Sequence, residues 1–412
     1  MALVVQKFGG TSVGDPQKLT AVARRLVAAR EAGSQVVGVL SAMGRVTDEL
    51  LALSHEVSPL PEPRELDMLL SVGERISCAL AAMAINDLGH KAISLTGSQA
   101  GIVTDTTHGK AKIVDIRAHR IHEALEADQI VLVAGFQGVS TDFEVTTLGR
   151  GGSDLTAVAL AAALDADVCE IFTDVEGVFT ADPRIVPEAR KLTHVSYEEM
   201  LELSASGGKV LMLRSVEFAR SHGVRIHVRS SFSDTEGTLV TSQEELMEQP
   251  IISGIAHDTS EAEITILGVP DRPGIAAAVF RKLADETVNV DMIVQNVSAE
   301  GHTDISFTVP KSELLRIDPV IQAVAAEVGA RGVQQDSEIA KISLIGAGMK
   351  SNPGVAADMF DALAEAGINI GIISTSSIRI SCVVPAGEVE RAVRVVHDKF
   401  RLSESVVLAE EG

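Results

Sequence analysis

The C-terminal part of the chain repeats itself, and this internal repeat constrains the possible folds more than any other feature of the sequence. Four short motifs recur with a displacement of 80 positions: Pro273-Gly274 with Pro353-Gly354, Phe280 with Phe360, Leu283-Ala284 with Leu363-Ala364, and Asn289 with Asn369. Each copy reads as strand, Pro-Gly turn, helix, strand, strand and helix, with first strands at 264–268 and 342–346. Such regular self-similarity predicts two copies of one compact α+β unit. The apolar residues 251–256, just before the first copy, could complete a module begun elsewhere in the chain.

The first 245 residues follow a different pattern, in which strand-like apolar runs alternate with helical stretches. The runs lie at 35–41, 91–95, 130–134, 168–173 and 224–228. Alternation of this kind predicts an α/β domain whose mainly parallel sheet is covered by helices on both faces. A polar, acidic segment that ends at Pro250 is typical of a linker. We therefore expect three domains, at 1–245, 264–338 and 339–412.

The composition excludes several classes of partner. A formal net charge of -22 and a sequence pI of about 4.9 predict a surface that repels nucleic acid and anionic membranes. Aromatic residues make up 3% of the chain and tryptophan is absent, so no aromatic platform for stacking bases is expected. Cys78, Cys169 and Cys382 stand among apolar neighbours, which favours buried thiols over a metal cluster or a disulfide framework. Without a leader or a membrane-length apolar run, the sequence predicts a soluble cytoplasmic protein.

The first chemically informative motif follows the apolar run at 3–5, where Lys7-Phe8 leads into Gly9-Gly10-Thr11-Ser12. This order predicts a buried strand, a glycine turn and the start of a helix. Two adjacent glycines allow close backbone approach to a ligand, and the free amides of a helix N-terminus favour an anion such as phosphate. Lys7 could add a positive charge. An ordinary strand-to-helix turn with an exposed lysine explains these residues equally well.

A second glycine-rich motif, Gly149-Arg150-Gly151-Gly152-Ser153-Asp154, precedes an almost wholly apolar helix at 155–164. Ser153 and Asp154 are typical of a helix start, as N-cap and as acidic partner of the helix dipole. Neither role explains Arg150 or the glycine pair. Because a guanidinium group is a rigid fork that fits a carboxylate or a phosphate, this motif favours a binding function.

A third motif, 173–184, follows a predicted strand and is rich in turn-forming residues. Open α/β sheets bind ligands at the carboxyl ends of their strands. Phe179 could contact a base, Asp174 and Asp182 a sugar or hydrated magnesium, and Arg184 a phosphate, although a plain Asx-turn loop is an equal alternative. The chain has neither a Walker motif nor a complete dinucleotide fingerprint, so any nucleotide site is of another type.

These motifs together resemble the aspartate kinase family of the amino acid kinase superfamily. The resemblance rests on Lys7-Phe8-Gly9-Gly10-Thr11-Ser12, Phe136-Gln137-Gly138, Gly149-Arg150-Gly151-Gly152-Ser153-Asp154, Thr173-Asp174-Val175 and Thr180-Ala181-Asp182-Pro183-Arg184. The repeat resembles the paired ACT modules through which such enzymes sense end products. Together the two resemblances cover nearly the whole chain. They imply an α/β amino acid kinase-like fold, with a mainly parallel sheet between helices, and two α+β ACT (βαββαβ) modules.

The resemblance also implies an activity, the transfer of the ATP γ-phosphoryl group to the β-carboxylate of L-aspartate to give 4-phospho-L-aspartate. This is the first step of lysine, threonine and methionine biosynthesis, and the expected cofactors are ATP and Mg²⁺. Because a carboxylate with a pKa of about 4 is already ionised at neutral pH, the reaction needs no general base. The barrier is instead the repulsion between two anions, which cations and backbone amides lower.

The family pattern implies roles for individual residues. Lys7 would stabilise the transferring phosphoryl group, and Asp154 would orient the cationic groups around it. Four residues would bind the substrate, through its α-carboxylate (Arg150), its α-ammonium (Glu74) and further hydrogen bonds (Thr47 and Ser153). The nucleotide would contact Lys7, Phe8, Gly9, Gly10, Ser12, Thr173, Asp174, Phe179, Arg184 and Lys209. No residue is expected to bind a metal ion directly.

The sequence departs from the family pattern at two points. After Lys209 the chain reads Val210-Leu211-Met212-Leu213-Arg214, where many relatives carry His-Pro-Arg. Phe179 stands where a tyrosine is common, which keeps the apolar face and loses a hydroxyl. The nucleotide edge of the site is therefore expected to differ in detail from that of relatives.

The ACT resemblance implies feedback inhibition by lysine, threonine or both. The effector's charged groups would meet loop backbone and polar side chains at Asp271, Arg272, Pro273, Gly274, Asn289, Val290 and Asp291 in the first copy, and at Asn352, Pro353, Gly354, Asn369 and Ile370 in the second. The expected assembly is a homo-oligomer or an association with a shorter, ACT-only subunit.

Two other interpretations stay open at this point. The chain could be an amino acid kinase with a different acidic acceptor, such as glutamate or acetylglutamate; the pairing of Glu74 with Arg150 and the ACT repeat favour aspartate. It could also be a non-catalytic amino acid sensor that kept the fold. The presence of Lys7, Asp154 and Arg150 argues against a sensor.

Overall fold

The computed structural model describes residues 1–245, 251–297 and 301–404, and its contacts divide the chain into two compact units. The first unit comprises Met1–Val178, Lys191–Ser204 and Lys209–Met247. The second comprises Phe179–Arg190, Ala205–Gly208 and Glu248–Gly412. The chain thus passes from the first unit to the second at Phe179 and returns to the first unit at Lys191.

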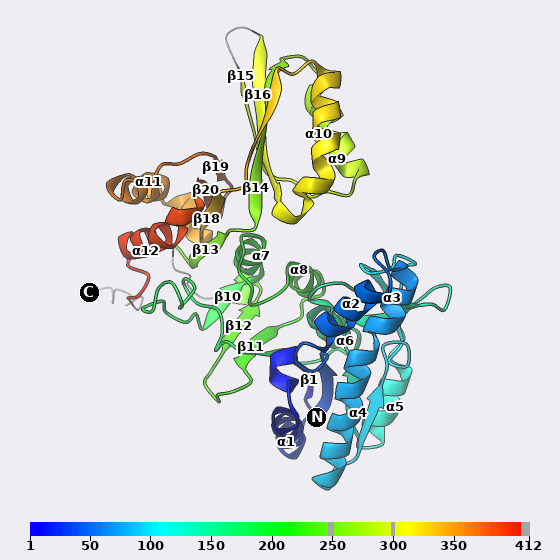
Figure 1. The fold of residues 1–412 in the computed structure, drawn as a ribbon. Coiled ribbons are helices and arrows are strands. Elements are labelled where there is room, and N and C mark those ends of the chain that lie inside the picture. Colours follow the sequence, from blue (N-terminus) through cyan, green and yellow to red (C-terminus); the bar gives the residue numbers. More distant parts are fainter. Residues whose placement is uncertain (246–250, 298–300, 405–412) are drawn as a thin grey trace, which may run out of the picture. The chain divides into compact units, whose positions relative to one another are not determined.

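The first unit is built on a mainly parallel sheet, as the alternating pattern predicts (Figure 1). Its strand order is β10-β12-β11-β9-β1-β2-β6-β3. The strands are β1 (Leu3–Phe8), β2 (Gln35–Leu40), β3 (Ala92–Leu95), β6 (Ile130–Ala134), β9 (Val168–Thr173), β10 (His194–Ser196), β11 (Ile226–Ser230) and β12 (Thr238–Thr241). Neighbours pair in parallel except β11 and β12, which are antiparallel. The carboxyl ends of β1, β2, β6 and β9 therefore meet at one edge, where such sheets bind ligands.

Helices cover this sheet, and one of them is buried on nearly all sides. They are α1 (Pro16–Glu31), α2 (Val46–Val57), α3 (Pro63–Leu70), α4 (Val72–Asp87), α5 (His119–Glu126), α6 (Gly152–Ala163), α7 (Tyr197–Ala205) and α8 (Leu213–His222). In α6 every residue from Gly152 to Ala161 is buried, as expected for a helix of almost wholly apolar composition. A second sheet, of order β5-β4-β7-β8, was not predicted because its strands are short: β4 (Ile102–Thr104), β5 (Ile113–Ile116), β7 (Gln137–Ser140) and β8 (Val145–Thr147).

The stretch Pro63–Asp87 departs from the prediction that no apolar run reaches membrane-spanning length. By length and composition it would pass as a membrane-crossing helix. Half of its most apolar window is buried inside the protein, however, and the stretch carries the buried acids Asp67 and Glu74. The stretch comprises the two helices α3 and α4, and α4 packs against α1 and β3 in the first unit.

The first copy of the repeat folds as one contiguous module in the second unit. It runs through β14 (Glu261–Pro270), α9 (Ile275–Asp285), β15 (Asp291–Val297), β16 (His302–Pro310), α10 (Leu314–Val328) and β17 (Gly332–Asp336). The strands form an antiparallel sheet of order β15-β16-β14-β17, and α9 and α10 pack together against it (Figure 1). This is the predicted βαββαβ arrangement.

The second copy builds the same kind of sheet but takes one strand from another part of the chain. Its own elements are β18 (Ile339–Ile345), α11 (Val355–Glu365), β19 (Ile373–Thr375), β20 (Arg379–Pro385) and α12 (Val389–Lys399). The sheet order is β13-β18-β20-β19, and β13 (Gly254–Asp258) pairs antiparallel with β18. β13 stands beside β18 as β17 stands beside β14 in the first module. The suggestion that 251–256 completes a module is confirmed.

The segment Phe179–Arg190 packs with this second module. Ala181, Ile185 and Val186 are buried in the hydrophobic core that includes the residues of β18 and α12. The Thr180 carbonyl accepts a hydrogen bond from the Ile255 amide (2.8 Å), and the Thr180 hydroxyl lies 3.0 Å from His397 Nε2. A loop that reads as a ligand-binding turn in sequence is thus tied to the second unit by both backbone and side chains.

Candidate functional site

The glycine turn after β1 is shaped by a close approach of two backbone segments. A 3₁₀ helix at Gly10–Val13 begins directly after Gly9. A Cβ atom on Gly10 would lie 3.0 Å from the carbonyl oxygens of both Ala42 and Gly44, so a larger residue would push the turn apart. The Gly10 carbonyl accepts a hydrogen bond from the Gly44 amide (3.0 Å). The turn after β1 is therefore fixed against the turn after β2.

Lys7 and Asp154 form an ion pair at this edge of the sheet. Lys7 Nζ lies 2.6 Å from Asp154 Oδ1, and the side chains are 12% and 10% exposed. Asp154 lies in the first turn of α6, where the helix dipole stabilises negative charge. A Cβ atom on Gly9 would lie 3.3 Å from the Lys7 ammonium, so the glycine keeps space beside the charge. The two motifs that sequence analysis singled out are thus in direct contact.

The start of α6 depends on glycines at two positions. Gly149 and Gly151 have φ angles of 78° and 72°, a left-handed conformation that disfavours other residues. A Cβ atom on Gly151 would lie 1.9 Å from the Met212 side chain. Gly151, not Ser153, is the N-cap residue, because this left-handed turn starts the helix at Gly152. The predicted capping role of Ser153 is wrong; its hydroxyl instead lies against Gly135 at the end of β6, where a Cβ atom would be 2.7 Å away.

Arg150 stands between these two glycines and is exposed. Within the described residues its guanidinium group has no hydrogen bond or ion pair. All of its donors are therefore available to a ligand, and the fork geometry suits a carboxylate or a phosphate.

Glu74 is a buried carboxylate with an open hydrogen-bonding position. Its side chain lies in the first turn of α4, and the residue is 3% exposed. Oε1 accepts a hydrogen bond from the Ala42 amide (3.3 Å), while Oε2 has no partner among the described residues. Burial raises the pKa of Glu74 to about 7. A cationic group would both satisfy Oε2 and stabilise the ionised form. Thr47 lies half-buried in the first turn of α2.

The residues predicted for the nucleotide differ in what the structure offers. The Phe8 side chain is fully buried and stacks on Phe172 with ring centroids 4.7 Å apart, so it presents no surface to a ligand. Ser12 is buried, and its hydroxyl lies 2.6 Å from that of Ser231. At the end of β9, the Thr173 hydroxyl donates to Asp174 Oδ1 (3.1 Å).

The remaining predicted nucleotide contacts are distributed over both units. Lys209 is exposed and belongs to the first unit. Phe179 and Arg184 belong to the second unit. Arg184 Nη2 lies 2.6 Å from Asp182 Oδ2 and Arg184 Nε 3.0 Å from Asp182 Oδ1, an arrangement in which the guanidinium group holds the pKa of Asp182 below its ordinary value.

Sequence reasoning missed two positions that shape this edge. Ser231 follows β11 and meets Ser12, and Gly135 follows β6 and makes room for Ser153. Both come directly after strands that the sequence predicts, so their place at a carboxyl strand end was an available signal. As for metals, no cluster of three His, Cys, Asp or Glu side chains that could bind an ion occurs in the described ranges.

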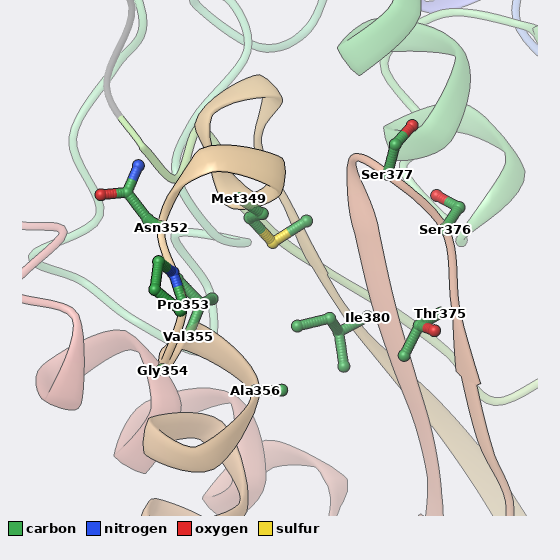
Figure 2. Close-up of a pocket in the computed structure, with 10 residues that line it drawn as sticks. All are labelled: Met349, Asn352, Pro353, Gly354, Val355, Ala356, Thr375, Ser376, Ser377 and Ile380. Atoms are coloured by element: carbon green, nitrogen blue, oxygen red, sulfur yellow. The ribbon is translucent and has the colours of Figure 1, made fainter.

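The second module contains a pocket of 370 Å³ at the predicted effector turn. Figure 2 shows Asn352, Pro353 and Gly354 on one side of it and the hairpin residues Thr375, Ser376 and Ser377 on the other. Gly354 has a φ of 108° and caps the N-terminus of α11. The lining thus combines polar side chains (Asn352, Thr375, Ser376 and Ser377) with apolar ones (Met349, Val355 and Ile380). The predicted residues Asn369 and Ile370 are not among those that line it.

The corresponding residues of the first module are arranged differently. Asp271, Arg272, Pro273 and Gly274 are exposed before α9, and Asn289 is exposed before β15.

Two further predicted effector residues of the first module already have contacts within the protein. Val290 packs against the core of the first module. The Asp291 carboxylate is taken by a lysine of the second module, since Lys341 Nζ lies 2.7 Å from Asp291 Oδ2. Asp291 is therefore not a free acceptor for an effector ammonium group in this conformation.

Comparison with known proteins agrees with this geometry. Residues 2–230 match the amino acid kinase family, and residues 264–317 and 342–400 match an ACT domain. An aspartokinase of Mycolicibacterium smegmatis is 58% identical, with 100% of each chain covered. The E. coli aspartokinase III structure in complex with aspartate and ADP (R-state) has a TM-score of 0.82 and 26% identity, covering 96% of this chain and 99% of that one. The E. coli aspartokinase III complex with lysine and aspartate (T-state) has a TM-score of 0.74 and 25% identity, covering 97% and 99%.

Proposed function

The chain belongs to the amino acid kinase family and, within it, to the aspartokinases, and from this premise we propose how its residues perform and regulate the reaction. The proposed reaction transfers the γ-phosphoryl group of ATP to the β-carboxylate of L-aspartate, which supplies 4-phospho-L-aspartate for lysine, threonine and methionine biosynthesis. The observation that carries it is the Lys7–Asp154 ion pair at the ends of β1 and the start of α6. Exposed Arg150 lies on the turn before α6, and buried Glu74 accepts a hydrogen bond from the Ala42 amide after β2. They offer one cationic and one acidic group for an amino acid substrate.

Lys7 would stabilise the phosphoryl group during transfer. An ammonium group has three donors, and Asp154 takes one of them. The space beside Gly9 leaves the others for phosphate oxygens. Asp154 would hold the ammonium in place and does not act as a base, because the attacking carboxylate is already ionised. The rate enhancement comes from positioning and from positive charge at the transferring group.

Arg150 and Glu74 would select a free α-amino acid. Arg150 would bind the α-carboxylate through its fork, and the α-ammonium would fill the open position at Glu74 Oε2. Thr47 and Ser153 would add hydrogen bonds. This arrangement disfavours acetylglutamate, whose acylated nitrogen carries no positive charge to pair with Glu74.

ATP would bind along the edge formed by Gly9, Gly10, Ser12, Thr173 and Asp174, with Lys209 at the phosphates. Phe179 and Arg184, which belong to the second unit, stay predictions from the family resemblance. The E. coli relative was crystallised with ADP, which supports nucleotide use. Mg²⁺ would be held mainly by the nucleotide phosphates, as in other kinases, and would supply charge neutralisation there. The buried free thiols Cys78, Cys169 and Cys382 fit a reducing cytoplasm.

Regulation would reside in the paired modules, with lysine, threonine or both as inhibitors. The pocket at Asn352–Gly354 is one proposed effector site, and the exposed turn at Asp271–Gly274 is its counterpart in the first module. The lysine complex of the E. coli relative supports an amino acid effector. The active assembly would be a homo-oligomer, or a complex with a shorter subunit made of the ACT modules.

The first test is hydroxylamine trapping of the acyl phosphate with ATP and Mg²⁺. The acceptors are aspartate, glutamate and acetylglutamate, each with and without lysine plus threonine. We expect hydroxamate with aspartate, and less of it when the effectors are added. Hydroxamate formed with another acceptor, and not with aspartate, would identify that acceptor as the substrate. Hydroxamate formed with aspartate in an amount unchanged by millimolar lysine plus threonine would refute the proposed feedback inhibition.

A further inference from the structure

Asp67 is a fully buried carboxylate that the roles above do not use. It lies on α3 and is 1% exposed. An ionised carboxylate in such a place is stable when several donors surround it. Asp67 has three: the Thr147 hydroxyl at 2.5 Å, the Gly109 amide at 3.1 Å, and His108 Nδ1 at 2.8 Å. These hydrogen bonds tie α3 to the segments that contain His108, Gly109 and Thr147.

The donors come from two segments that meet beside the Arg150 turn. Gly109 and His108 belong to the loop between β4 and β5, and Thr147 is the last residue of β8. The Gly109 carbonyl would lie 3.1 Å from a Cβ atom on Gly149, so this loop packs directly on the turn that carries Arg150. Asp67 thus joins the loop to the strand end that leads into the turn.

Arg214, a cationic residue, contacts the same two segments. Its guanidinium group donates to the Leu148 carbonyl (2.9 Å) and to the Ala111 carbonyl (3.1 Å). The Ala111 amide in turn donates to the Thr147 carbonyl (2.9 Å). Asp67 of α3 and Arg214 of α8 therefore both bind the loop between β4 and β5 and the end of β8. The turn Gly149–Gly151 comes directly after this strand end in the sequence.

We propose that Asp67 is a positioning residue for substrate aspartate, which acts by holding the Arg150 turn in its binding conformation. Arg150 has no partner of its own within the described residues, so its placement depends on the turn. Two glycines in the left-handed conformation give that turn little resistance to bending. The inference rests on the proposed function of Arg150 as the ligand of the substrate α-carboxylate.

The test compares Asp67→Ala and Asp67→Asn in the full-length enzyme by steady-state kinetics. For Asp67→Ala we expect the KM for aspartate to rise at least ~10-fold, because small displacements of a positioning group cost this much or more. The KM for ATP should change less than about twofold, since phosphate contacts lie elsewhere. Asp67→Asn keeps an acceptor for Thr147 but turns an NH₂ group towards the Gly109 amide, so it should recover only part of the affinity.

A second substrate separates positioning from general damage. L-Aspartate α-amide (isoasparagine) lacks the α-carboxylate, so the wild-type enzyme should use it poorly and Asp67→Ala should lower its kcat/KM no further. The matched control is Glu199→Ala, which removes another buried acid, one that accepts hydrogen bonds from Ser196 at the start of α7. That variant should lose thermal stability without a change in the KM for aspartate.

Two results would overturn the inference, and they differ from a failure of the proposed function. Equal losses of Asp67→Ala with aspartate and with its α-amide would show that Asp67 does not act through the α-carboxylate. A change in the KM for ATP as large as that for aspartate would show a general structural role. If Arg150→Met itself leaves the KM for aspartate unchanged, the assignment of Arg150 fails, whatever Asp67 does.

Discussion

Lys7 and Lys341 are both lysines with little exposure to solvent, but they differ in the number of their acidic partners. The Lys7 side chain is 12% exposed and has one acidic partner, Asp154 at 2.6 Å. The Lys341 side chain is 1% exposed and has two, Glu261 at 2.8 Å and Asp291 at 2.7 Å. The first lies at the glycine turn after β1, and the second lies on β18 where it joins the two modules of the repeat.

The difference suggests a criterion: a lysine that binds a ligand keeps donors free, whereas a structural lysine uses its donors within the protein. At Lys341 the partners are themselves satisfied, since Glu261 also accepts from Thr308 (2.5 Å) and Asp291 from the Met292 amide (2.8 Å). Although burial opposes it, the Lys341 ammonium holds the pKa of Asp291 below its ordinary value. The Lys341 ammonium thus has two acidic partners inside the protein, and each of these binds a further donor. At Lys7 the single partner leaves donors open towards the space beside Gly9, as a phosphate site requires.

The sharpest way to break the comparison is to replace Lys7 by methionine, which keeps the length of the side chain and removes its charge. We expect kcat to fall by ~10³-fold, because one cation at a transferring phosphoryl group is worth about this much. Hydroxamate formation measures the loss, and circular dichroism checks that the fold is kept. Turnover close to that of the wild type would assign the phosphoryl group to another cation.

The same substitution at Lys341 should have the reverse effect. Lys341→Met leaves the Glu261 and Asp291 carboxylates, whose side chains are 13% and 38% exposed, without their shared cation. This should cost about 1–3 kcal/mol of stability, because solvent screens part of the repulsion. Urea unfolding followed by circular dichroism measures this cost, and kcat without effectors should stay within about twofold of the wild type since no substrate contact is lost. The triple variant with Glu261→Gln and Asp291→Asn should recover part of the stability. Unchanged unfolding of Lys341→Met would refute a structural role.

A pH profile tests the acid of the catalytic edge. Since the folded-state pKa of Glu74 is about 7 and its ordinary value 4.5, its charge is lost as pH falls through 7. The kcat/KM for aspartate should therefore fall about tenfold between pH 8 and pH 6, in proportion to the ionised fraction. Glu74→Gln should have a lower but flatter profile. Parallel profiles of the two enzymes would assign the pH dependence to another group.

Linkage gives a second measurement at the same residue. The folded state binds the Glu74 proton more tightly than the unfolded state, so this group adds stability as pH falls from about 7 towards 4.5. Thermal unfolding of wild type and Glu74→Gln over this range isolates the contribution. The stability advantage of the variant should be largest above pH 7 and should shrink as pH falls.

The smallest effect is expected at a lysine of the surface. Lys282 is 53% exposed, and its Nζ lies 3.9 Å from Glu327. Lys282→Met should change the free energy of unfolding by less than about 0.5 kcal/mol, because solvent screens such pairs. The same urea titration as for Lys341→Met provides the comparison. A loss as large as that at Lys341 would show that burial does not separate the two classes.

Features carried by contiguous residues could be predicted from the sequence. The strands at 130–134 and 168–173 are found as predicted, because each is a continuous apolar run. Lys7 and Asp154 were singled out through two glycine motifs, and the structure places both motifs at turns between a strand and a helix, with the two side chains 2.6 Å apart. The capping role of Ser153 could not be judged correctly, since the start of α6 depends on the left-handed turn at Gly151 and on its packing against Met212.

Features carried by residues far apart in sequence were not predictable. The ion cluster of Lys341 brings together positions on β14, β15 and β18, and no local pattern connects them. Asp67 and Arg214 each look like ordinary helix residues until the loop between β4 and β5 is placed between them. Asp291 was assigned to an effector site for the same reason, because its partner lies in the other copy of the repeat.

The strand β13 gives the regulatory half a nested order of folding. β13 leaves the ribosome first, the whole of the first module (Glu261–Asp336) follows, and the partner strand β18 comes last. During synthesis the contiguous first module can form by itself, while β13 waits with an open edge that is prone to wrong pairing. The two copies have similar folds but differ in chain continuity. The first module is one continuous segment, whereas a segment that contains the whole second module, from β13 to α12, also contains the first.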